Sequence, residues 1–530
     1  MLRVFKPLAL MFLAIGILGI QMQCGGSGGS AATPAPPILP TYQLTVIVDG
    51  SVQGSPAAAS HPLTSGTPVP YSYTPGPGMA SALVVIDGNP APASGTLAMN
   101  QDHVLWAFGL PASGTSFPGM MTIPSDVTQI PYPQFYTGQT GFSFTVPAPY
   151  CTVASTVIAY PASYLGTYPL PAIQGAPLAT GILRGISDKD CYWSNNPSYS
   201  VTCNGCSGTD NHLAFQDMLA RNKNLGADYI TVGQGVILDD SSAPTLTFDA
   251  STDNISDTDL TWMVAQANAL GMGLHMDLEI TGDVAGLGPP TTTPTTEYVT
   301  NFLSAWSTYV VNRATKAQQQ GVAAMSIDWS CWGYQCWGSQ FWPAYIQSMT
   351  ALAQQVRSVY NGKIYMGVQG YGGMIADPNL LANIDWMRVC LNDSLTSTQV
   401  NNLSVALRKQ TYIDQINSIA SGMGNLVIPV IWIVCAQSYN NYFLDGPVED
   451  GLCVNGCMQA SLTTDFSVQA IGYEGELEAI SAQTAFPNAA VEPISYWWVD
   501  VILPDQSFPN LSTSCRNKPA ESILYQWYKR

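Results

Sequence analysis

The 530-residue sequence predicts an α/β fold, a (β/α)8 TIM barrel preceded by a small all-β domain. The first observation is that apolar strand-like runs alternate with amphipathic helical stretches from residue 181 to the end. The second is their number, because eight β units separated by helices over about 350 residues are typical of a closed barrel. The third is that residues 41–112 show β-type alternation bounded by Gly, Pro and Asn, and no helical period.

The eight predicted barrel strands share a buried, apolar pattern, and they cover residues 182–187, 227–233, 273–280, 323–328, 363–369, 384–392, 427–435 and 493–500. Several intervening helices end at Gly or Asn-Gly, which suits a helix C-terminus. A doubly wound open sheet is the alternative. It would usually carry a Gly-rich phosphate loop after the first strand, and the sequence has none there.

The amino-terminal residues have the features of an export signal. Arg3 and Lys6 flank an apolar run that ends at Ile20 and has the length of a signal-peptide core. Cys24 follows, and residues 24–40 form a Gly-, Ser- and Pro-rich flexible tether. The segment resembles a bacterial lipoprotein leader, which implies a signal peptide over residues 1–23, a lipid on Cys24 and a cell-surface, outer-membrane or periplasmic location. Simple secretion into the extracellular space is the alternative.

Composition limits the classes of partner. Lys and Arg total 17 against 35 Asp and Glu, a formal charge of −18, which argues against nucleic acid and against an anionic membrane surface. Contact with a membrane is expected only through the lipid anchor. Twelve cysteines in an exported chain favour disulfides. The close pairs Cys203/Cys206, Cys331/Cys336 and Cys453/Cys457 are candidates for local bridges. No cofactor and no metal site is predicted.

Residues 41–112 resemble a divergent internalin-type B-repeat, a small β domain of bacterial surface proteins. The resemblance is carried by LTVIVDG, VPYSYTP and ALVVIDG in that order. Residues 113–180 are rich in Pro, Tyr and Thr and are predicted to be a β-rich connecting segment. The barrel is predicted to span residues 181–530.

The stretch Gly321–Trp342 carries the strongest functional signal. It is a buried strand that ends at Asp328 and continues into an aromatic loop with Trp329, Trp332 and Trp337. Flat aromatic faces stack on the apolar faces of sugar rings, and a carboxylate can bind hydroxyl groups or move protons. The pattern therefore favours a sugar-binding cleft. The alternative is that these tryptophans fill a large core.

Other acids lie where barrel strands end, which is where barrels place their chemistry. Asp277 and Glu279 are two residues apart on the third strand, so both side chains point to the same side. A structural ion pair with Arg184 or Arg388 would be another explanation for one of these acids. The remaining strand-end and loop acids are candidates for turn or helix caps (Asp188, Asp190 and Asp393) or for substrate binding (Asp500), and Asp385 opens the sixth strand at the opposite, structural end.

The predicted barrel resembles a glycoside hydrolase of family 113, through phrases such as LGADYITVG, NIDWMRVCLN, SVQAIGYEGELEAI and NKPAESILYQWY. The resemblance implies an acid/base glutamate after strand four and a nucleophilic glutamate after strand seven. Ser330 and Val434 stand at those positions, so that mechanism does not transfer. Glu474 and Glu476 lie in the helix after strand seven and are expected to be solvated.

Three functions stay open at this point. The first is an exported glycosidase acting on polysaccharide or oligosaccharide, with Asp328 and either Glu279 or Asp277 as its carboxylate pair. The second is a catalytically inactive barrel that binds carbohydrate, and the third is a structural cell-surface lipoprotein. The predicted substrate-binding residues are Trp329, Trp332, Trp337, Trp497, Trp498 and Asp500.

Overall fold

The computed structural model groups residues 41–530 into one contact unit, apart from residues 1–40. The residues it describes are 39–48, 52–77, 79–87, 89–111, 116–118, 142–146, 156–160, 162–171, 176–188, 211–239, 247–248, 250, 253–281, 295–329, 339–367, 369–370, 373–374, 376–391, 395–440, 442–445, 463–495, 513–515 and 518–529.

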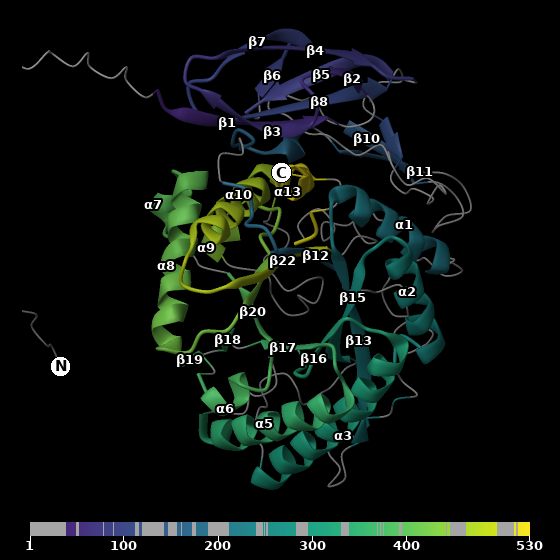
Figure 1. Cartoon of the computed structure of the whole chain (residues 1–530). Coiled ribbons are helices and arrows are strands. Elements are labelled where there is room, and N and C mark those ends of the chain that lie inside the picture. Colours follow the sequence, from purple (N-terminus) through teal and green to yellow (C-terminus); the bar gives the residue numbers. More distant parts are fainter. Residues whose placement is uncertain are drawn as a thin grey trace, which may run out of the picture. The chain divides into compact units, whose positions relative to one another are not determined.

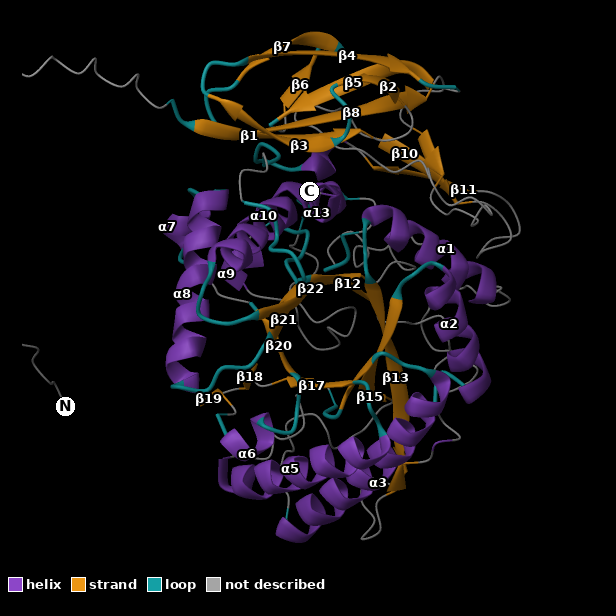
Figure 2. Ribbon diagram, in the orientation of Figure 1, coloured by secondary structure: helices purple, strands orange, loops and turns teal. Residues whose placement is uncertain are grey.

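Eight parallel strands close into a barrel, which confirms the predicted fold class (Figure 1). They are β12 (Leu183–Asp188), β13 (Tyr229–Asp239), β15 (Gly273–Thr281), β16 (Ala324–Ser326), β17 (Lys363–Gly367), β20 (Trp386–Cys390), β21 (Val430–Val434) and β22 (Asn488–Ser495). Each pairs with its neighbour in chain order, β22 pairs with β12, and the ring is complete. Figure 2 shows this ring of strands with helices around its outside.

The last barrel strand differs most from its predicted position. The sequence places it at 493–500, whereas β22 begins five residues earlier and pairs with both β21 and β12. Pro493 lies inside the strand although it has no backbone N–H to donate. The pairing with β12 is interrupted there, with partners at Arg184/Val491 and next at Ser187/Ile494. As a result, Glu492 belongs to the barrel wall.

The helices that accompany these strands are mostly closed by side-chain caps. Thr295 accepts from the Tyr298 backbone N–H at the start of α3, and Gly321 ends that helix with φ of 83°, a conformation that favours glycine. The helices are α1 (Asn211–Leu225), α2 (Asp257–Ala269), α3 (Thr296–Gln320), α5 (Trp342–Val359), α6 (Pro378–Leu381), α7 (Ser397–Val400), α8 (Val405–Met423), α9 (Tyr442–Asp445), α10 (Phe466–Ala482) and α13 (Pro519–Lys529), with 3-10 turns η1 (Ala162–Leu165) and η3 (Ser339–Phe341).

Helix α10 is buried on all sides. Every residue from Phe466 to Ile480 is buried, because α8 and α13 pack along it. The expectation that Glu474 and Glu476 are solvated is therefore wrong, since both are 0% exposed. The Glu474 carboxylate accepts from the Trp527 ring N–H at 2.6 Å. Burial raises the pKa of Glu476 well above its usual range, and the nearby Arg408 opposes that rise.

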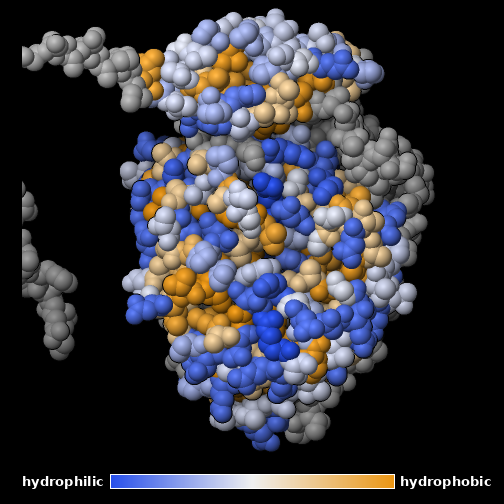
Figure 3. Space-filling model, viewed as in Figure 1, coloured by the Kyte–Doolittle hydropathy of each residue, from blue (hydrophilic) through white to orange (hydrophobic). Residues whose placement is uncertain are grey.

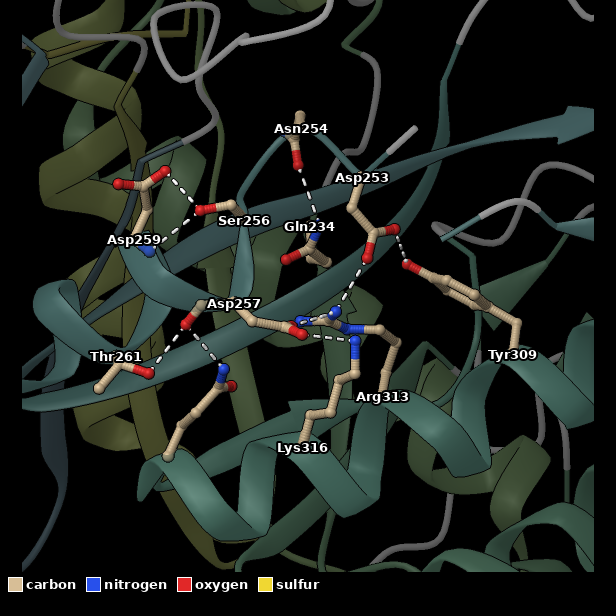
Figure 4. Close-up of polar contacts among 11 residues, drawn as sticks. Gln234, Asp253, Asn254, Ser256, Asp257, Asp259, Thr261, Tyr309, Arg313 and Lys316 are labelled. Carbon is tan, nitrogen blue, oxygen red and sulfur yellow. Dashed lines mark hydrogen bonds and ion pairs between the residues drawn. The ribbon is translucent and has the colours of Figure 1, made fainter. Parts of the chain in front are cut away.

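A partly buried ion-pair group joins the start of α2 to α3 (Figure 4). The Arg313 guanidinium donates to Asp253 and to Asp257, both at 2.8 Å, and Tyr309 donates to the other oxygen of Asp253 at 2.8 Å. Burial raises the pKa of Asp253 to about 6, although Arg313 and Tyr309 oppose the rise. These acids are held as structural partners, away from the interior of the ring.

Replacing Arg313 with leucine is expected to destabilise the protein by about 3–5 kcal/mol, because the buried Asp253 carboxylate loses its cation. Lys316→Ala is the matched control, since Lys316 is 39% exposed and its pair with Asp257 should contribute about 0–1 kcal/mol. Urea unfolding of both variants measures the difference. Equal losses in the two variants would contradict this account of the group.

The amino-terminal region contains two antiparallel-rich sheets around a core of its own. One sheet has the order β3-β1-β8-β5-β6 and the other β2-β4-β7. Leu44, Val84 and Leu105 are fully buried in that core. The strands are β1 (Thr41–Val48), β2 (Val52–Ser55), β3 (Ala59–Thr64), β4 (Pro68–Pro75), β5 (Met79–Ile86), β6 (Asn89–Ala91), β7 (Ser94–Ala98) and β8 (His103–Pro111).

Short strands complete the described structure. Three of them form a separate sheet in the connecting segment: β9 (Ser116–Pro118), β10 (Phe142–Val146) and β11 (Thr156–Tyr160). β14 (Thr247–Phe248) pairs with β13, and β18 (Gln369–Gly370) and β19 (Gly373–Met374) pair with each other.

The surface offers few large apolar side chains. Among the described residues only Leu39 and Val427 are large hydrophobics that stand exposed. Figure 3 shows hydrophilic and hydrophobic residues interspersed over one face. Within the described part of the chain, no helix combines the length and apolar character needed to cross a membrane.

Candidate functional site

The barrel interior is lined by alternate residues of each strand, and its amino-terminal part is aromatic. Tyr229 and His275 stack with ring centroids 3.8 Å apart, and Tyr365 and Ile431 belong to the same interior cluster. Burial lowers the pKa of His275 to about 3, with a further contribution from Arg388. The imidazole is therefore neutral, and this layer works as a floor for the polar groups above it.

Arg388 on β20 lies at the centre of the next layer. Its guanidinium pairs with Asp277 of β15 and, at 2.8 Å, with Glu492 of β22. The second oxygen of Glu492 accepts from the Tyr229 hydroxyl at 3.0 Å and the Thr231 hydroxyl at 2.9 Å. A buried cation thus bridges two carboxylates that come from different sides of the ring. The sequence analysis left open whether one of the strand-end acids forms a structural ion pair with Arg388, and Asp277 forms it.

Asp328 lies just after β16, at the carboxyl end of the barrel. It is 4% exposed, and one of its carboxylate oxygens accepts from the Gly367 backbone N–H at 2.9 Å. Burial raises the pKa of Asp328 to about 7, and the negative charge of Asp277 adds to the rise, while the Gly367 N–H and Arg388 oppose it. This carboxyl group can therefore hold or release a proton near neutral pH, which an ordinary aspartate cannot do.

Glu279 occupies the next inward position of β15 after Asp277. It is paired in register with Gly235 of β13, and its carboxylate approaches Gly233. A Cβ added to Gly233 would lie 3.4 Å from the carboxylate carbon of Glu279. The missing side chain on β13 therefore gives Glu279 room on the inner side. Asp277 and Glu279 alternate with outward residues of β15, and Asp328 follows β16, so all three lie towards the carboxyl end of the barrel.

A disulfide joins the carboxyl ends of β20 and β21. It links Cys390 to Cys435, which are 45 residues apart in the chain. Cys435 belongs to the interior cluster, whereas Val434 packs outward in the main core. The inward residue at the end of the seventh strand is therefore a half-cystine, not the Val434 that the family comparison suggested. The three predicted local cysteine pairs lie outside the described residues.

The aromatic residues proposed to bind substrate fall into two groups. Trp329 is 4% exposed, and its ring packs between Phe302, Trp306 and Tyr345. This position favours the core-filling alternative for Trp329. The other four tryptophans predicted to bind substrate lie outside the described residues: Trp332, Trp337, Trp497 and Trp498. So do Asp500, also predicted to bind substrate, and Cys24, the predicted lipid attachment site.

Asp385 lies at the other end of the barrel. It precedes β20 and bonds to the Lys363 ammonium at 3.0 Å and to the Ile364 N–H at 2.9 Å, next to Arg357. These contacts outweigh burial and hold the pKa of Asp385 below its usual value. The prediction that it serves the structural end is confirmed. In the described part of the chain, no cluster of three or more His, Cys, Asp or Glu side chains is arranged to hold a metal.

The sequence analysis missed one residue of the interior network and the central position of another. Glu492 was missed because the eighth strand was placed too late, and its signal was an acid within the apolar run before Pro493. Arg388 was considered only as an ion-pair partner, although an arginine inside a predicted barrel strand indicates buried carboxylates around it. Together these residues make a network of one cation and several carboxyl groups at the carboxyl half of the barrel.

By fold and interior, the chain is a (β/α)8-barrel protein with a buried carboxylate–guanidinium site. Similar solved structures are glycoside-hydrolase barrels. A family 113 β-1,4-mannanase shares 13% identity over 66% of this chain and 99% of its own, with a TM-score of 0.45. The family 113 β-mannanase of Alicyclobacillus acidocaldarius shares 13% identity over 67% of this chain and 99% of its own, also with a TM-score of 0.45. Fungal β-1,4-galactanases share 13% identity over 59% of this chain and 91% of their own, with a TM-score of 0.37. No protein-family model and no curated protein matches the sequence.

Proposed function

We propose that the protein is a glycosidase that cleaves polysaccharide or oligosaccharide by carboxyl acid/base chemistry inside the barrel. The observation that carries the proposal is Asp328, a carboxyl group with a pKa of about 7 beside the acidic Asp277. Glycoside hydrolysis uses two carboxyl groups, one protonated and one ionised. Environments that separate the proton affinities of neighbouring acids supply that pair.

The roles follow from the surroundings of each acid. Asp328 is the general acid, because its raised pKa keeps the proton that the leaving glycosidic oxygen must receive. Glu279 is the better candidate for the second carboxyl group of the reaction, as nucleophile or as base for water. Asp277 is bound to Arg388 and therefore has less freedom to react. Its charge instead maintains the proton affinity of Asp328.

The test is sugar release from mannans, glucans, galactans and xylans by the full chain, followed by reducing-end and chromatographic product analysis. Asp328→Asn is the control for contaminating activity. We expect release from at least one polymer by the protein and loss of that release in the variant. Release that persists unchanged in Asp328→Asn, or no release from any polymer, would contradict the proposal.

A barrel that binds carbohydrate without cleaving it is the second candidate. It is favoured by the bridging of Asp277 and Glu492 through Arg388, which gives two interior acids a structural role. Affinity electrophoresis on the same polymers separates the two functions. Retardation without sugar release supports the binding barrel.

We also propose that the protein is exported, with Cys24 as a lipid attachment site. The leader sequence supports this, and so does the Cys390–Cys435 disulfide, since disulfides persist in oxidising compartments. Cell fractionation measures it, and recovery of the chain in the cytosol would contradict export.

A further inference from the structure

A pocket of about 650 Å³ lies against the loops that follow β20 and β21. Its walls come from residues 163–168, from α7 and α9, and from the chain that leads into α10. Helix α7 follows β20 and α9 follows β21, so the pocket lies on the side of the barrel where strands end. Asp328 lies at the end of β16 on that same side. The pocket and Asp328 therefore lie towards the same end of the barrel.

Aromatic rings form much of the lining. Tyr164 and Tyr168 are half-buried residues of the pocket wall, and the Tyr164 ring also meets Phe466 edge-on, with ring centroids 5.8 Å apart. Tyr442 and Phe443 are buried below, with ring centroids 4.8 Å apart. Such rings present apolar faces with polar edges, which suits the alternating C–H faces and hydroxyl groups of a sugar ring.

The polar part of the lining is uncharged except for one carboxylate. Thr463, which is exposed, and Asn440 bring a hydroxyl and an amide to the wall. Asp465 is 3% exposed, and its oxygens accept from the Thr167 hydroxyl at 2.8 Å and the Ser467 N–H at 3.0 Å. The Asp465 carboxylate therefore has a structural role in the pocket wall. No lysine or arginine is among the lining residues that the structure describes, so an anionic ligand would find no cation there.

The wall is held in place by its own hydrogen bonds. The Tyr168 hydroxyl donates to the Val400 carbonyl at 3.1 Å, which ties the connecting segment to α7. The Tyr442 hydroxyl donates to the Cys435 carbonyl at 3.3 Å, which ties α9 to the end of the seventh strand. A pocket built this way exists before the ligand arrives, and its volume is within the range of about 300–1,000 Å³ usual for small-molecule sites.

We propose that this pocket binds a short, neutral stretch of glycan, as a subsite on the rim beside the barrel opening. The ligand class is uncharged and polyhydroxylated, because the lining offers ring faces, hydroxyl and amide groups and no exposed charge partner. The inference deepens the proposed function, on which it rests for the class of ligand. It concerns binding only. The residues that contact the glycan are Tyr164 and Tyr168 rather than the barrel carboxylates.

The test is isothermal titration of the full chain with the β-1,4-linked pentasaccharides of mannose, glucose and galactose. Asp328→Asn serves as the background, so that no ligand is consumed. We expect at least one pentasaccharide to bind, and Tyr164→Leu to weaken that binding at least tenfold. Thr463→Trp, which adds a ring at an exposed wall position without removing packing, should weaken it similarly by filling the pocket.

Trp262→Leu on α2 is the matched control, since Trp262 is also half-buried and does not line the pocket. It should bind like the background protein. Unchanged affinity in both pocket variants, or no binding of any pentasaccharide, would overturn the inference. Pocket-dependent binding by a protein that releases no sugar from any polymer would keep the inference and reject the glycosidase. Sugar release by the protein, together with unchanged affinity in the pocket variants, would keep the glycosidase and reject the inference about this pocket.

Discussion

Replacing Arg388 with methionine is expected to destabilise the protein by about 3–5 kcal/mol at neutral pH, because two buried carboxylates then lose their shared cation. Asp277 and Glu492 are 3% and 1% exposed, so water cannot replace the guanidinium. Glu492 keeps its bonds from Tyr229 and Thr231, whereas Asp277 loses the ion pair that Arg388 supplies.

Urea unfolding at neutral pH measures this effect. Arg357→Met is the matched control, since Arg357 is 32% exposed and its partner Asp385 keeps the contact with Lys363. Its expected cost is about 0–1 kcal/mol. Adding Asp277→Asn and Glu492→Gln to Arg388→Met should recover much of the stability, because no unpaired charge then remains. A loss below about 1 kcal/mol in Arg388→Met would show that the interior ions are hydrated.

Strand and helix periodicity predicted the barrel because each of its elements has a repeating pattern of its own. Seven of the eight strands overlap their predicted ranges, since most of them are short apolar runs between clear turns, although β13 runs six residues past its predicted end at 233. The eighth strand was predicted at the aromatic run that starts at Pro493. The observed strand begins at Asn488, because pairing with β12 and β21 sets its position. Strand pairing is a long-range property, and a local pattern does not contain it.

The site was predictable to the same limit. The positions of Asp277, Glu279 and Asp328 at the ends of their strands were predictable, because strand-end position and two-residue spacing are local. Glu492 and the Cys390–Cys435 bridge could not, because each depends on which strands become neighbours across the ring. The burial of Trp329 is a third case, since only the packing of α3 and α5 around it decides between core and cleft. Partners distant in sequence set the chemistry of this interior.

Replacing Asp328 with asparagine is expected to lower kcat by about 10²–10⁴ on any polymer that the protein cleaves, because asparagine has no proton to donate to the leaving oxygen. The same change should stabilise the fold at high pH. A folded-state pKa of about 7, above the usual value, means that stability falls as pH rises from about 4 to 7 and that the cost is complete above 7. Asparagine removes this cost, which is at most about 4 kcal/mol for a rise of about three pKa units.

Two measurements check the role of Asp328 together. The rate of the wild-type protein should fall about tenfold per pH unit above pH 7, as the general acid loses its proton. In Asp277→Asn this fall should begin at lower pH, because the negative charge that raises the pKa of Asp328 is gone and the opposing Arg388 remains. Asp385→Asn, at the amino end of the barrel, is the control and should keep the wild-type profile. If Asp328→Asn loses stability at pH 8 and keeps its rate, the buried carboxyl group is a structural element and catalysis resides elsewhere.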